Sequence, residues 1–539
     1  MRVEINLSYN KGFKWFSSNS IYVKGYLFDT NNNLYKEELL IKYFENINTI
    51  EEFKQKLIDA NGIFSVVIKQ EKQTFIAVDR TRTFPIFYAE TDDAFYISDD
   101  IFIIKNKINT TILNISSEEF LLTGYVSGKD TLFKKIYQIE SGELIFFHQN
   151  RLHIINYHNF VLDINYNLNS IDKIYQDIEQ ISNNIFNRLI NYANGRTLLI
   201  PLSGGYDSRY IIVMLKKLNY QNIIAFTYGK KDSPEVKVSK KIANILDVKH
   251  YFIEYNYSTW EETFSDSLLD YFFYSFNGVS LTHIQDIYAI TYLHRNNILP
   301  KDTIVVPGHS GDLIGGSHIR AEYDILKKDS KFLDIKEIIY LKYYGFKEED
   351  YKKVIFKKLE KQLKGENAYN SYSFTENWNI KNRQSKYIIN SCRLYEYYGY
   401  KFLLPLWDIE ITDYFISLPL KYRVDNIIYN QYLEENLFKK FKINFLKKEP
   451  LYKNYYIQNI KNMLPLNISK YLKNIYVLFK NRKNDVNNFN LIDNILLKDI
   501  NHKDVRYKDF KELLGIWIID KVREKDIDEL EKNNSNCTQ

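Results

Sequence analysis

Short apolar runs alternate with amphipathic stretches over residues 197–306, which is the pattern of strands alternating with helices. The first run leads into a glycine-rich turn, after which a helix is expected to begin at about Ser208. A second helix is expected from about Pro234, because proline favours the first helical turn. Such alternation builds a parallel sheet through right-handed crossovers, and ligands bind at the carboxyl ends of its strands. The strands are predicted at residues 197–202, 222–229, 249–253 and 303–306.

The N-terminal third carries a different pattern, in which short apolar runs are separated by turns. Strands are predicted there at residues 61–68, 75–80, 85–88 and 95–99. An asparagine-rich stretch at 165–170 precedes an amphipathic helix, whose apolar side holds Ile171, Ile174, Tyr175, Ile178, Ile181, Ile185 and Leu189. We therefore predict three parts, residues 1–168, 169–484 and 485–539, the last being a helical extension with a disordered tail from Asn533.

The turn after the first central strand reads Ser203-Gly204-Gly205-Tyr206-Asp207-Ser208 and is typical of a loop that binds pyrophosphate. Backbone N–H groups at the start of a helix attract phosphate oxygens, and glycines let the backbone approach them closely. The two serine hydroxyls can donate to phosphate, and Asp207 can hold a magnesium ion. Because the chain has no Walker A lysine motif, the turn favours cleavage between the α and β phosphates over γ-phosphoryl transfer. The alternative is an ordinary Ser-capped turn without a ligand.

A second glycine-rich loop, Pro307-Gly308-His309-Ser310-Gly311-Asp312, follows the fourth predicted strand. In a parallel sheet it lies at the same edge as the first loop, and each loop contributes one carboxylate. Asp207 and Asp312 therefore predict magnesium held between phosphate groups from both sides.

These two loops and the later segment Leu404-Pro405-Leu406-Trp407-Asp408 occur in the same order in the synthetase domain of asparagine synthetase B, and the chain resembles this family. Its relatives include β-lactam and carbapenam synthetases, lasso-peptide cyclases and amidotransferase-like proteins of surface-polysaccharide loci. The resemblance implies an α/β protein with two parts. The first is an Ntn-type α+β sandwich like the class II glutamine amidotransferases, and the second is an adenine-nucleotide α-hydrolase-like parallel sheet with helices, the fold of the PP-loop ATP pyrophosphatases.

The implied chemistry uses ATP and Mg²⁺ to activate a substrate carboxylate as an acyl-adenylate, with release of pyrophosphate and capture of the acyl group by an amine. The resemblance assigns nucleotide binding to Ser203, Gly204, Gly205, Asp207, Ser208, Thr227, Tyr228 and Gly308, and metal binding to Asp207 and Asp312. The family's second acid after Asp312 is replaced here by Leu313, and the loop is one residue shorter, which weakens the metal-binding prediction.

Two residues are candidates for catalysis. His309 stands where asparagine synthetase carries Glu and the β-lactam relatives carry Tyr, a position that the resemblance associates with the proton of the attacking amine. Histidine suits proton removal near neutral pH, although a histidine that only hydrogen-bonds a turn is the alternative. Lys448 aligns with a family lysine that stabilises negative charge on pyrophosphate, which a cation opposite a leaving group would do. The sequence leaves open whether Lys447 or Lys448 points inward, and a solvated basic face is the alternative for both.

The glutaminase activity of the family needs an N-terminal cysteine, freed by removal of the initiator methionine. Here the second residue is Arg2, and the cysteines are Cys392 and Cys537, so we expect the amidotransferase-like domain to be inactive. The amine is then expected as free ammonia, as an amino acid or as an amino sugar.

A cluster of cations, Arg383, Lys386 and Arg393, precedes the Pro405 segment. Resemblance to surface-polysaccharide proteins implies that this stretch helps to bind an acidic substrate, but ordinary helix-surface charge is the favoured interpretation for any one of these residues. Ile388, Ile389, Leu394 and Tyr395 are expected to form the buried stripe of a helix. Asp408 is expected to cap a following helix at 409–418.

The net charge of +6 is small for 539 residues and makes no case for nucleic-acid binding. No run of 18 apolar residues and no signal-peptide core occur, and the two cysteines fit a reducing compartment, so a cytoplasmic location is expected. Peripheral membrane association through the C-terminal basic run, and a homodimer, are further alternatives.

The function predicted from all this is an AMP-forming carboxylate–amine ligase that modifies an acidic sugar or amino-acid unit of a surface polysaccharide. A macrolactam-forming peptide cyclase and a non-catalytic nucleotide-binding or interaction protein are the alternatives.

Overall fold

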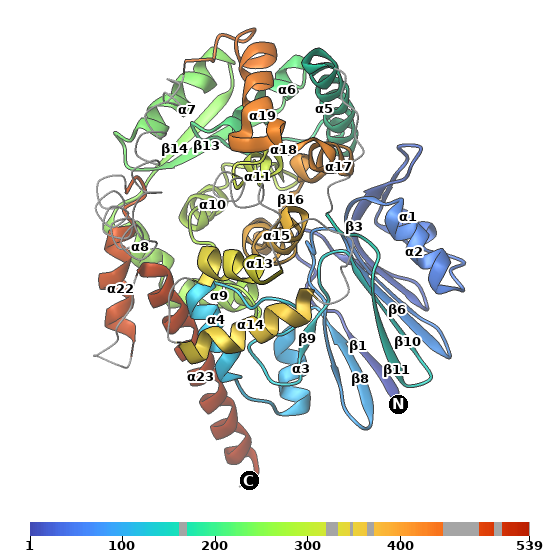
Figure 1. The fold of residues 1–539 in the computed structure, drawn as a ribbon. Helices are drawn as coiled ribbons and strands as arrows, with labels where there is room; N and C mark the ends of the chain where they lie inside the picture. The colour runs from blue at the N-terminus through green and yellow to red at the C-terminus, as the bar shows by residue number, and fades with distance from the viewer. Residues whose placement is uncertain are drawn as a thin grey trace.

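The computed structural model describes residues 1–160, 170–319, 332–344, 349–363, 371–445, 485–500 and 509–537. Its N-terminal part holds two sheets (Figure 1). One has the strand order β11-β10-β6-β5-β3-β2 with β4 beside β3, and the other has the order β1-β8-β7-β9. The strands are β1 (Arg2–Asn6), β2 (Trp15–Ser17), β3 (Ile21–Phe28), β4 (Leu34–Lys36), β5 (Asn61–Lys69), β6 (Gln73–Val78), β7 (Phe87–Glu90), β8 (Ala94–Ser98), β9 (Tyr137–Gln138), β10 (Glu143–His148) and β11 (Arg151–Asn156).

Successive side chains of a strand point to opposite faces of its sheet, which explains why the N-terminal sheets pack in layers. Val66 and Val67 are neighbours on β5 and therefore point to opposite faces. Val67 packs against side chains of the other sheet, whereas Val66 packs under the helices α1 (Glu38–Tyr43) and α2 (Ile50–Ile58). The α+β sandwich predicted for this part is present, with α3 (Ile101–Ile108) and α4 (Asn114–Thr123) completing it.

The second part is built on a five-stranded sheet with the order β14-β13-β12-β15-β16, in which all neighbouring strands run parallel. The strands are β12 (Leu198–Pro201), β13 (Ile223–Gly229), β14 (Lys249–Glu254), β15 (Ile304–Val305) and β16 (Lys401–Phe402). The four predicted strands are confirmed, and the two-residue strand β16 is too short to show in a hydrophobic pattern.

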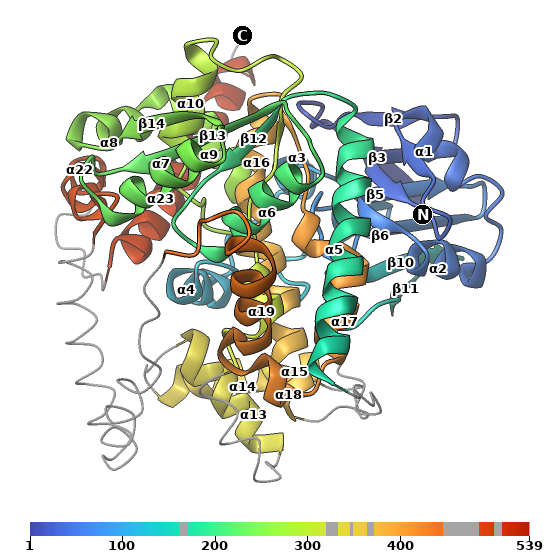
Figure 2. The same cartoon turned by 90° about the horizontal axis from the view of Figure 1, so that it is seen from above.

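Helices lie on both sides of this sheet (Figure 2). They include α5 (Ile171–Ala193), α6 (Tyr206–Lys217), α7 (Pro234–Ile245), α8 (Tyr257–Thr263), α9 (Leu269–Phe276), α10 (Ile287–Arg295) and α11 (Gly311–Gly315). The amphipathic helix predicted from Ile171 is α5, which buries Ile174, Ile178, Ile185 and Leu189. α6 begins at Tyr206 instead of Ser208, because Gly205 provides the cap position.

A mainly helical region follows β15. Its elements are α13 (Phe332–Ile339), η2 (Tyr340–Tyr344), α14 (Glu349–Leu363), α15 (Ser371–Asn379), the π-helix η3 (Ile380–Ile388), η4 (Ile389–Cys392), α16 (Arg393–Tyr397), η5 (Pro405–Trp407), α17 (Ile409–Ser417), α18 (Leu420–Arg423), η6 (Val424–Asn426), α19 (Ile427–Tyr432) and η7 (Leu433–Phe438). The chain closes with η8 (Phe489–Leu491), α22 (Ile492–Asp499) and α23 (Phe510–Cys537).

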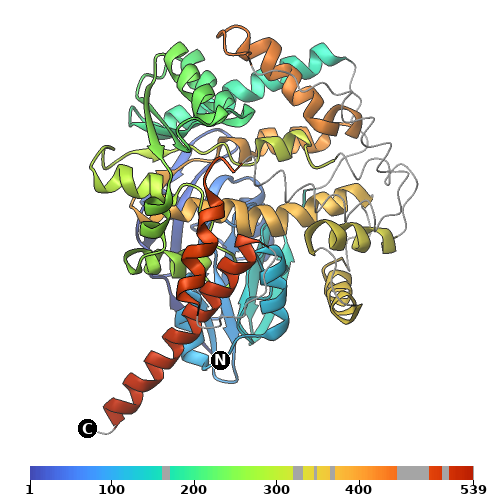
Figure 3. The same cartoon turned by 90° about the vertical axis from the view of Figure 1, so that its left-hand side faces the viewer.

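The C-terminal helix α23 contacts α4, α9 and α22 (Figure 3). It continues to Cys537, whereas the composition predicts a disordered tail from Asn533. Among the residues that the structure describes, no helix combines the length and the apolar character needed to cross a bilayer.

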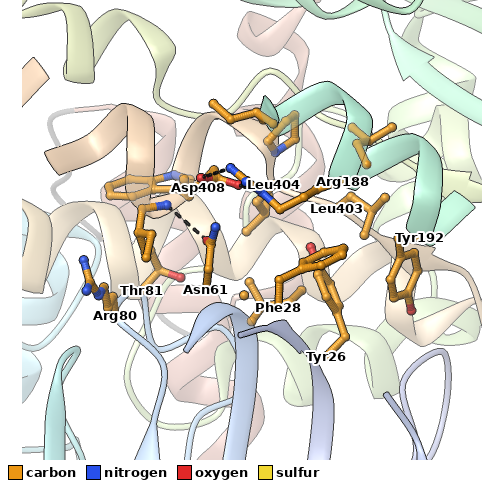
Figure 4. A pocket seen from close by; sticks show the side chains of 17 residues that line it. Tyr26, Phe28, Asn61, Arg80, Thr81, Arg188, Tyr192, Leu403, Leu404 and Asp408 are labelled. Atoms are coloured by element: carbon orange, nitrogen blue, oxygen red, sulfur yellow. Dashed lines mark hydrogen bonds and ion pairs between the residues drawn. The ribbon is translucent and has the colours of Figure 1, made fainter. Parts of the chain in front are cut away.

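Arg188 lies where the two parts of the protein meet (Figure 4), and its guanidinium donates a 2.9 Å hydrogen bond to the side-chain oxygen of Asn32 in the N-terminal part. From α5 its guanidinium donates two hydrogen bonds of 2.9 Å to the carboxylate of Asp408, and one of 2.6 Å to Glu410. Asp408 caps α17 by accepting from the Glu410 N–H, as predicted. The carbonyl oxygen of the Asn61 side chain, on β5, accepts from the backbone N–H of Ile409, so the N-terminal sheet contacts the same segment.

Candidate active site

The loop between β12 and α6 carries the predicted phosphate-binding turn. The Ser203 N–H donates to the Ser208 hydroxyl oxygen at 3.1 Å, and the Gly205 N–H donates to the Ser203 hydroxyl oxygen at 3.1 Å. No side chain caps α6, so backbone N–H groups of its first turn remain open to an anion. The turn, exposed at Ser203 and Gly205, thus has the geometry of an anion site at a helix N-terminus, although its two serines also stabilise the turn itself.

The loop at 307–312 lies directly against this turn. A Cβ atom at Gly308 would lie 3.0 Å from the backbone nitrogen of Ser208, and one at Gly311 would lie 2.6 Å from the carboxyl carbon of Asp207. A larger residue at Gly311 would displace the Asp207 carboxylate, and one at Gly308 would press against the backbone of the first loop. The glycines therefore explain how the two loops meet, and the parallel pairing of β12 with β15 brings them to one edge.

Asp207 is the centre of this contact. Its Oδ2 accepts a 3.0 Å hydrogen bond from the backbone N–H of Asp312, and its Oδ1 accepts one of 2.9 Å from the Tyr429 hydroxyl. Burial, followed by the negative charge of Asp312, raises the pKa of Asp207 to about 7. A cation between the carboxylates of Asp207 and Asp312 would remove the second of these effects, the repulsion between the two negative charges.

This donor set fits Mg²⁺, which commonly binds one or two carboxylates together with phosphate oxygens and water. Over the described ranges no group of three or more histidine, cysteine or acidic side chains is placed to hold a metal. A magnesium ion at Asp207 and Asp312 would therefore need the phosphates of a nucleotide to complete its ligands.

Both aspartates line an open cavity of about 430 Å³ at the carboxyl end of the sheet. Eight of the predicted site residues line it: Ser203, Gly205, Asp207, Ser208, Tyr228, Gly308, His309 and Asp312. Thr227 is not among them, because its buried hydroxyl donates to the Leu202 carbonyl oxygen at 2.6 Å. Gly204 is likewise not in the lining, and a Cβ atom there would face Val238. Lys447 and Lys448 lie outside the described residues.

His309 projects from the second loop, where burial lowers its pKa to about 4. Its Nε2 lies 2.8 Å from the Ser391 hydroxyl oxygen. The Ser391 hydroxyl oxygen also lies 2.7 Å from the Ile388 carbonyl oxygen, which can only accept. When the hydroxyl donates to this carbonyl, His309 Nε2–H donates to Ser391, and Nδ1 is the ring nitrogen that can accept a proton.

Sequence reasoning missed several residues of the cavity. Asp286 lines it, is buried and accepts a 2.7 Å hydrogen bond from the Tyr395 hydroxyl; burial raises its pKa to about 6. Tyr429, which orients Asp207, comes from α19. Neither Asp286 nor Tyr429 belongs to a sequence motif. The only sequence signal for this part of the cavity was the predicted buried stripe, which includes Tyr395.

The cation cluster at 383–393 separates into two kinds of residue. Lys386 is fully buried and donates to the Gly128 carbonyl oxygen at 2.6 Å, and Arg393 is buried with its guanidinium 3.9 Å from the ring centre of Tyr274. Helix-surface charge, the favoured interpretation of the cluster, is therefore wrong for these two. Lys386 bonds Gly128, and the Arg393 guanidinium also lies 5.2 Å from the ring centre of Tyr9, so both contact the N-terminal part. Arg383 is only partly buried.

Comparison with known proteins places the first loop in a recognised context. Residues 197–271 match the family model described as "Queuosine biosynthesis protein QueC". A stretch of 64 residues is 42% identical to a 7-cyano-7-deazaguanine synthase of Microcystis aeruginosa, covering 12% of this chain and 28% of that protein.

The chain is also similar to asparagine synthetases described as glutamine-hydrolysing. It is 26% identical over 215 residues to the enzyme of Rattus norvegicus, covering 36% of each chain, and 24% identical over 225 residues to that of Homo sapiens, covering 38% of this chain and 37% of the relative. The matches thus span about a third of the length of these relatives.

Similar solved structures include an NH3-dependent NAD synthetase from Campylobacter jejuni and a glutamine phosphoribosylpyrophosphate amidotransferase from B. subtilis. The first is 15% identical with a TM-score of 0.20 and covers 36% of this chain and 96% of that chain. The second is 10% identical with a TM-score of 0.19 and covers 55% and 63%. The predicted α/β fold class is confirmed, and the chain is a distant relative of asparagine synthetases over rather more than a third of its length.

Proposed function

We propose that the protein is an ATP-dependent ligase that adenylates a substrate carboxylate, releases pyrophosphate and transfers the acyl group to an amine. The observation that carries this proposal is the meeting of Asp207 and Asp312, from two loops, in one cavity at the open N-terminus of α6. The similarity of residues 197–271 to QueC and of a larger region to asparagine synthetases supports an adenine nucleotide as the ligand.

In the proposed reaction the loop at 203–208 holds the β and γ phosphates through its N–H groups and hydroxyls. When bound, Mg²⁺ would offset the charge of the phosphates. A carboxylate oxygen of the substrate attacks the α-phosphorus, the bond from that phosphorus to the bridging oxygen breaks, and pyrophosphate leaves. The amine nitrogen then attacks the acyl carbon, and AMP leaves as the amide bond forms.

The amine loses a proton in the second step, and we propose that His309 Nδ1 receives it. The pKa of about 4 belongs to the protein without nucleotide. Phosphate anions in the same cavity would raise this pKa toward neutrality, because an adjacent negative charge favours the protonated imidazole. Charge on the leaving pyrophosphate would be met by Lys448 or Lys447.

The amine is proposed to come from outside the protein. The first 168 residues contain no cysteine, and the thiol of Cys392, in the helical region, is buried with a raised pKa. Free ammonia, an amino acid or an amino sugar then serves as the acceptor. The resemblance to surface-polysaccharide proteins suggests a uronic acid or an amino-acid unit of a glycan as the carboxylate.

The test is carboxylate-dependent exchange of labelled pyrophosphate into ATP, with uronic acids, amino acids and peptides as candidate acids. We expect exchange with at least one acid, and its loss in Asp207→Ala. Asp232→Ala is the matched control, because Asp232 is an exposed acid outside the cavity. Peptides that support exchange and lose one water in the product would indicate the macrolactam cyclase instead.

A non-catalytic nucleotide-binding protein is the second candidate. It is favoured by one observation: both carboxylate oxygens of Asp207 already accept hydrogen bonds from within the protein. ATP binding without exchange across the whole acid panel would support this candidate over the ligase.

A further inference from the structure

A second cavity of about 170 Å³ adjoins the candidate active site, and His283 and Gln285 line both cavities. Its walls come from the segment before α10, from the π-helix η3, and from η8 and α23. Three aromatic residues, Tyr387, Phe489 and Phe510, form part of the lining. The second cavity is therefore a side chamber that opens beside the residues proposed to handle the nucleotide.

Two cations line this chamber, Arg383 from η3 and Lys511 from α23. Neither forms an ion pair with a carboxylate in the part of the chain that the structure describes. They differ in this from Lys386 and Arg393, whose charged groups contact protein carbonyl oxygens. Lys511 Nζ lies 5.8 Å from the ring centre of Tyr387.

His283 stands between the two cavities. Burial lowers its pKa to about 3, and the charges of His309, Lys511 and Arg383 add to this effect. The imidazole is thus neutral at pH 7, and its buried Nδ1 has no hydrogen-bond partner among the described residues. A buried polar atom without a partner carries a free-energy cost that a bound ligand would remove.

A hydrogen bond connects the chamber to the second glycine-rich loop. Ser310 adopts a left-handed conformation with a φ of 70°, and its hydroxyl donates to the side-chain oxygen of Gln384 at 2.8 Å. Gln384 follows Arg383 directly on the π-helix, a conformation that often marks functional positions. The position of the Arg383 backbone is therefore set relative to the loop that carries His309.

We propose that this chamber binds an anionic group, a carboxylate or a phosphate ester, carried by the substrate whose other carboxylate is activated. The inference rests on the proposed function for the identity of the ligand as the acyl substrate. The planar guanidinium of Arg383 can donate two parallel hydrogen bonds to two oxygens of such a group, and Lys511 adds a second positive charge. His283 contributes a hydrogen bond from its neutral ring. The protein would then prefer acids that carry two anionic groups.

The decisive experiment is calorimetric titration of the full chain with matched pairs of small acids. Glutarate is compared with butyrate to test for a second carboxylate, and phosphoglycolate with glycolate to test for a phosphate. We expect the dianion of at least one pair to bind at least tenfold more tightly than its partner. The pair that shows this preference identifies which anion the chamber takes.

Arg383→Gln and Lys511→Gln are expected to remove this preference, with affinity for ATP changed by less than twofold. Lys525→Gln is the matched control, since Lys525 is an exposed cation on α23 and lies outside the chamber. Arg383→Lys keeps the charge and should keep part of the preference, which separates loss of binding from a failure to fold. Equal binding of both members of each pair, or a preference that survives Arg383→Gln, would overturn the proposal.

Pyrophosphate exchange with the same acids separates this inference from the proposed function. If the dianion preference depends on Arg383 but no acid supports exchange, the anion chamber stands and the ligase proposal fails. If exchange occurs with no preference for dianions, the ligase stands and the chamber proposal is wrong.

Discussion

The Tyr429 hydroxyl donates a hydrogen bond of 2.9 Å to Oδ1 of Asp207, although the two residues are separated by 222 positions in the chain. This bond favours the ionised carboxylate and so opposes the effect of burial on the pKa of Asp207. The tyrosine from α19 thus limits the rise of the pKa, which stands at about 7, and favours the ionised form that Asp207 needs to bind a metal.

Tyr429→Phe should move the acidic limb of the pH–activity profile. Without the hydroxyl the pKa of Asp207 rises, and protons compete with Mg²⁺ up to a higher pH. The expected shift of the acidic midpoint is about one pH unit, the scale of a hydrogen bond to a charged group. Pyrophosphate exchange measured from pH 5.5 to 9 at subsaturating Mg²⁺ tests this; an unmoved midpoint would show that another group limits activity at low pH.

Asp207→Asn should stabilise the protein while it abolishes activity. The pKa of Asp207 is raised above its unfolded value, so the folded state keeps the proton between pH 4 and 7 and must ionise a buried group above that window. The free energy of unfolding of the wild type therefore falls as the pH rises through 4 to 7. We expect Asp207→Asn to be more stable by roughly 1 to 3 kcal/mol at pH 8, with little difference near pH 4.

Urea unfolding without nucleotide or Mg²⁺ measures this difference. Asp232→Asn provides the control, since Asp232 is exposed and should leave the free energy of unfolding unchanged at both pH values. A variant less stable than the wild type at pH 8 would contradict the interpretation of Asp207 as a buried carboxylate whose ionisation costs folding free energy.

Arg188→Met should weaken the contact between the two parts of the protein. The substitution leaves the carboxylate of Asp408 buried without its bidentate partner, and we expect a loss of about 3 to 5 kcal/mol in the free energy of unfolding. The double variant with Asp408→Asn should recover part of this loss, because the uncompensated charge is gone. Lys173→Met is the control for an exposed ion pair and should cost less than about 1 kcal/mol.

The protein should release no glutamate from glutamine. Ammonium chloride or a primary amine should instead complete the reaction once an activating acid is found. Alkylation of accessible thiols should not reduce activity, because Cys392 is buried. Measurable glutaminase activity in the purified protein would require a nucleophile other than cysteine in the first 168 residues.

Much of the fold could be predicted because it depends on local patterns. Four strands of the parallel sheet and the cap at Asp408 follow from apolar runs, a glycine end and a side chain that accepts N–H bonds. The interpretation of Lys386 and Arg393 as helix-surface charge was wrong, because both side chains are buried. Burial of those cations depends on carbonyl oxygens contributed by segments far away in the chain, such as Gly128.

The sequence by itself determined the two glycine-rich loops, their carboxylates and the residues at 203–208, since a turn between a buried strand and a helix is specified by a few adjacent residues. Only the tertiary structure decided that Asp207 contacts the N–H of Asp312, which is 105 positions away, and that Tyr429 completes its surroundings. The physical reason is the strand order: β15 lies beside β12, so the two loops meet at one edge. The second cavity, lined by Arg383 and Lys511, also depends on tertiary structure, because its walls come from segments that are far apart in the sequence.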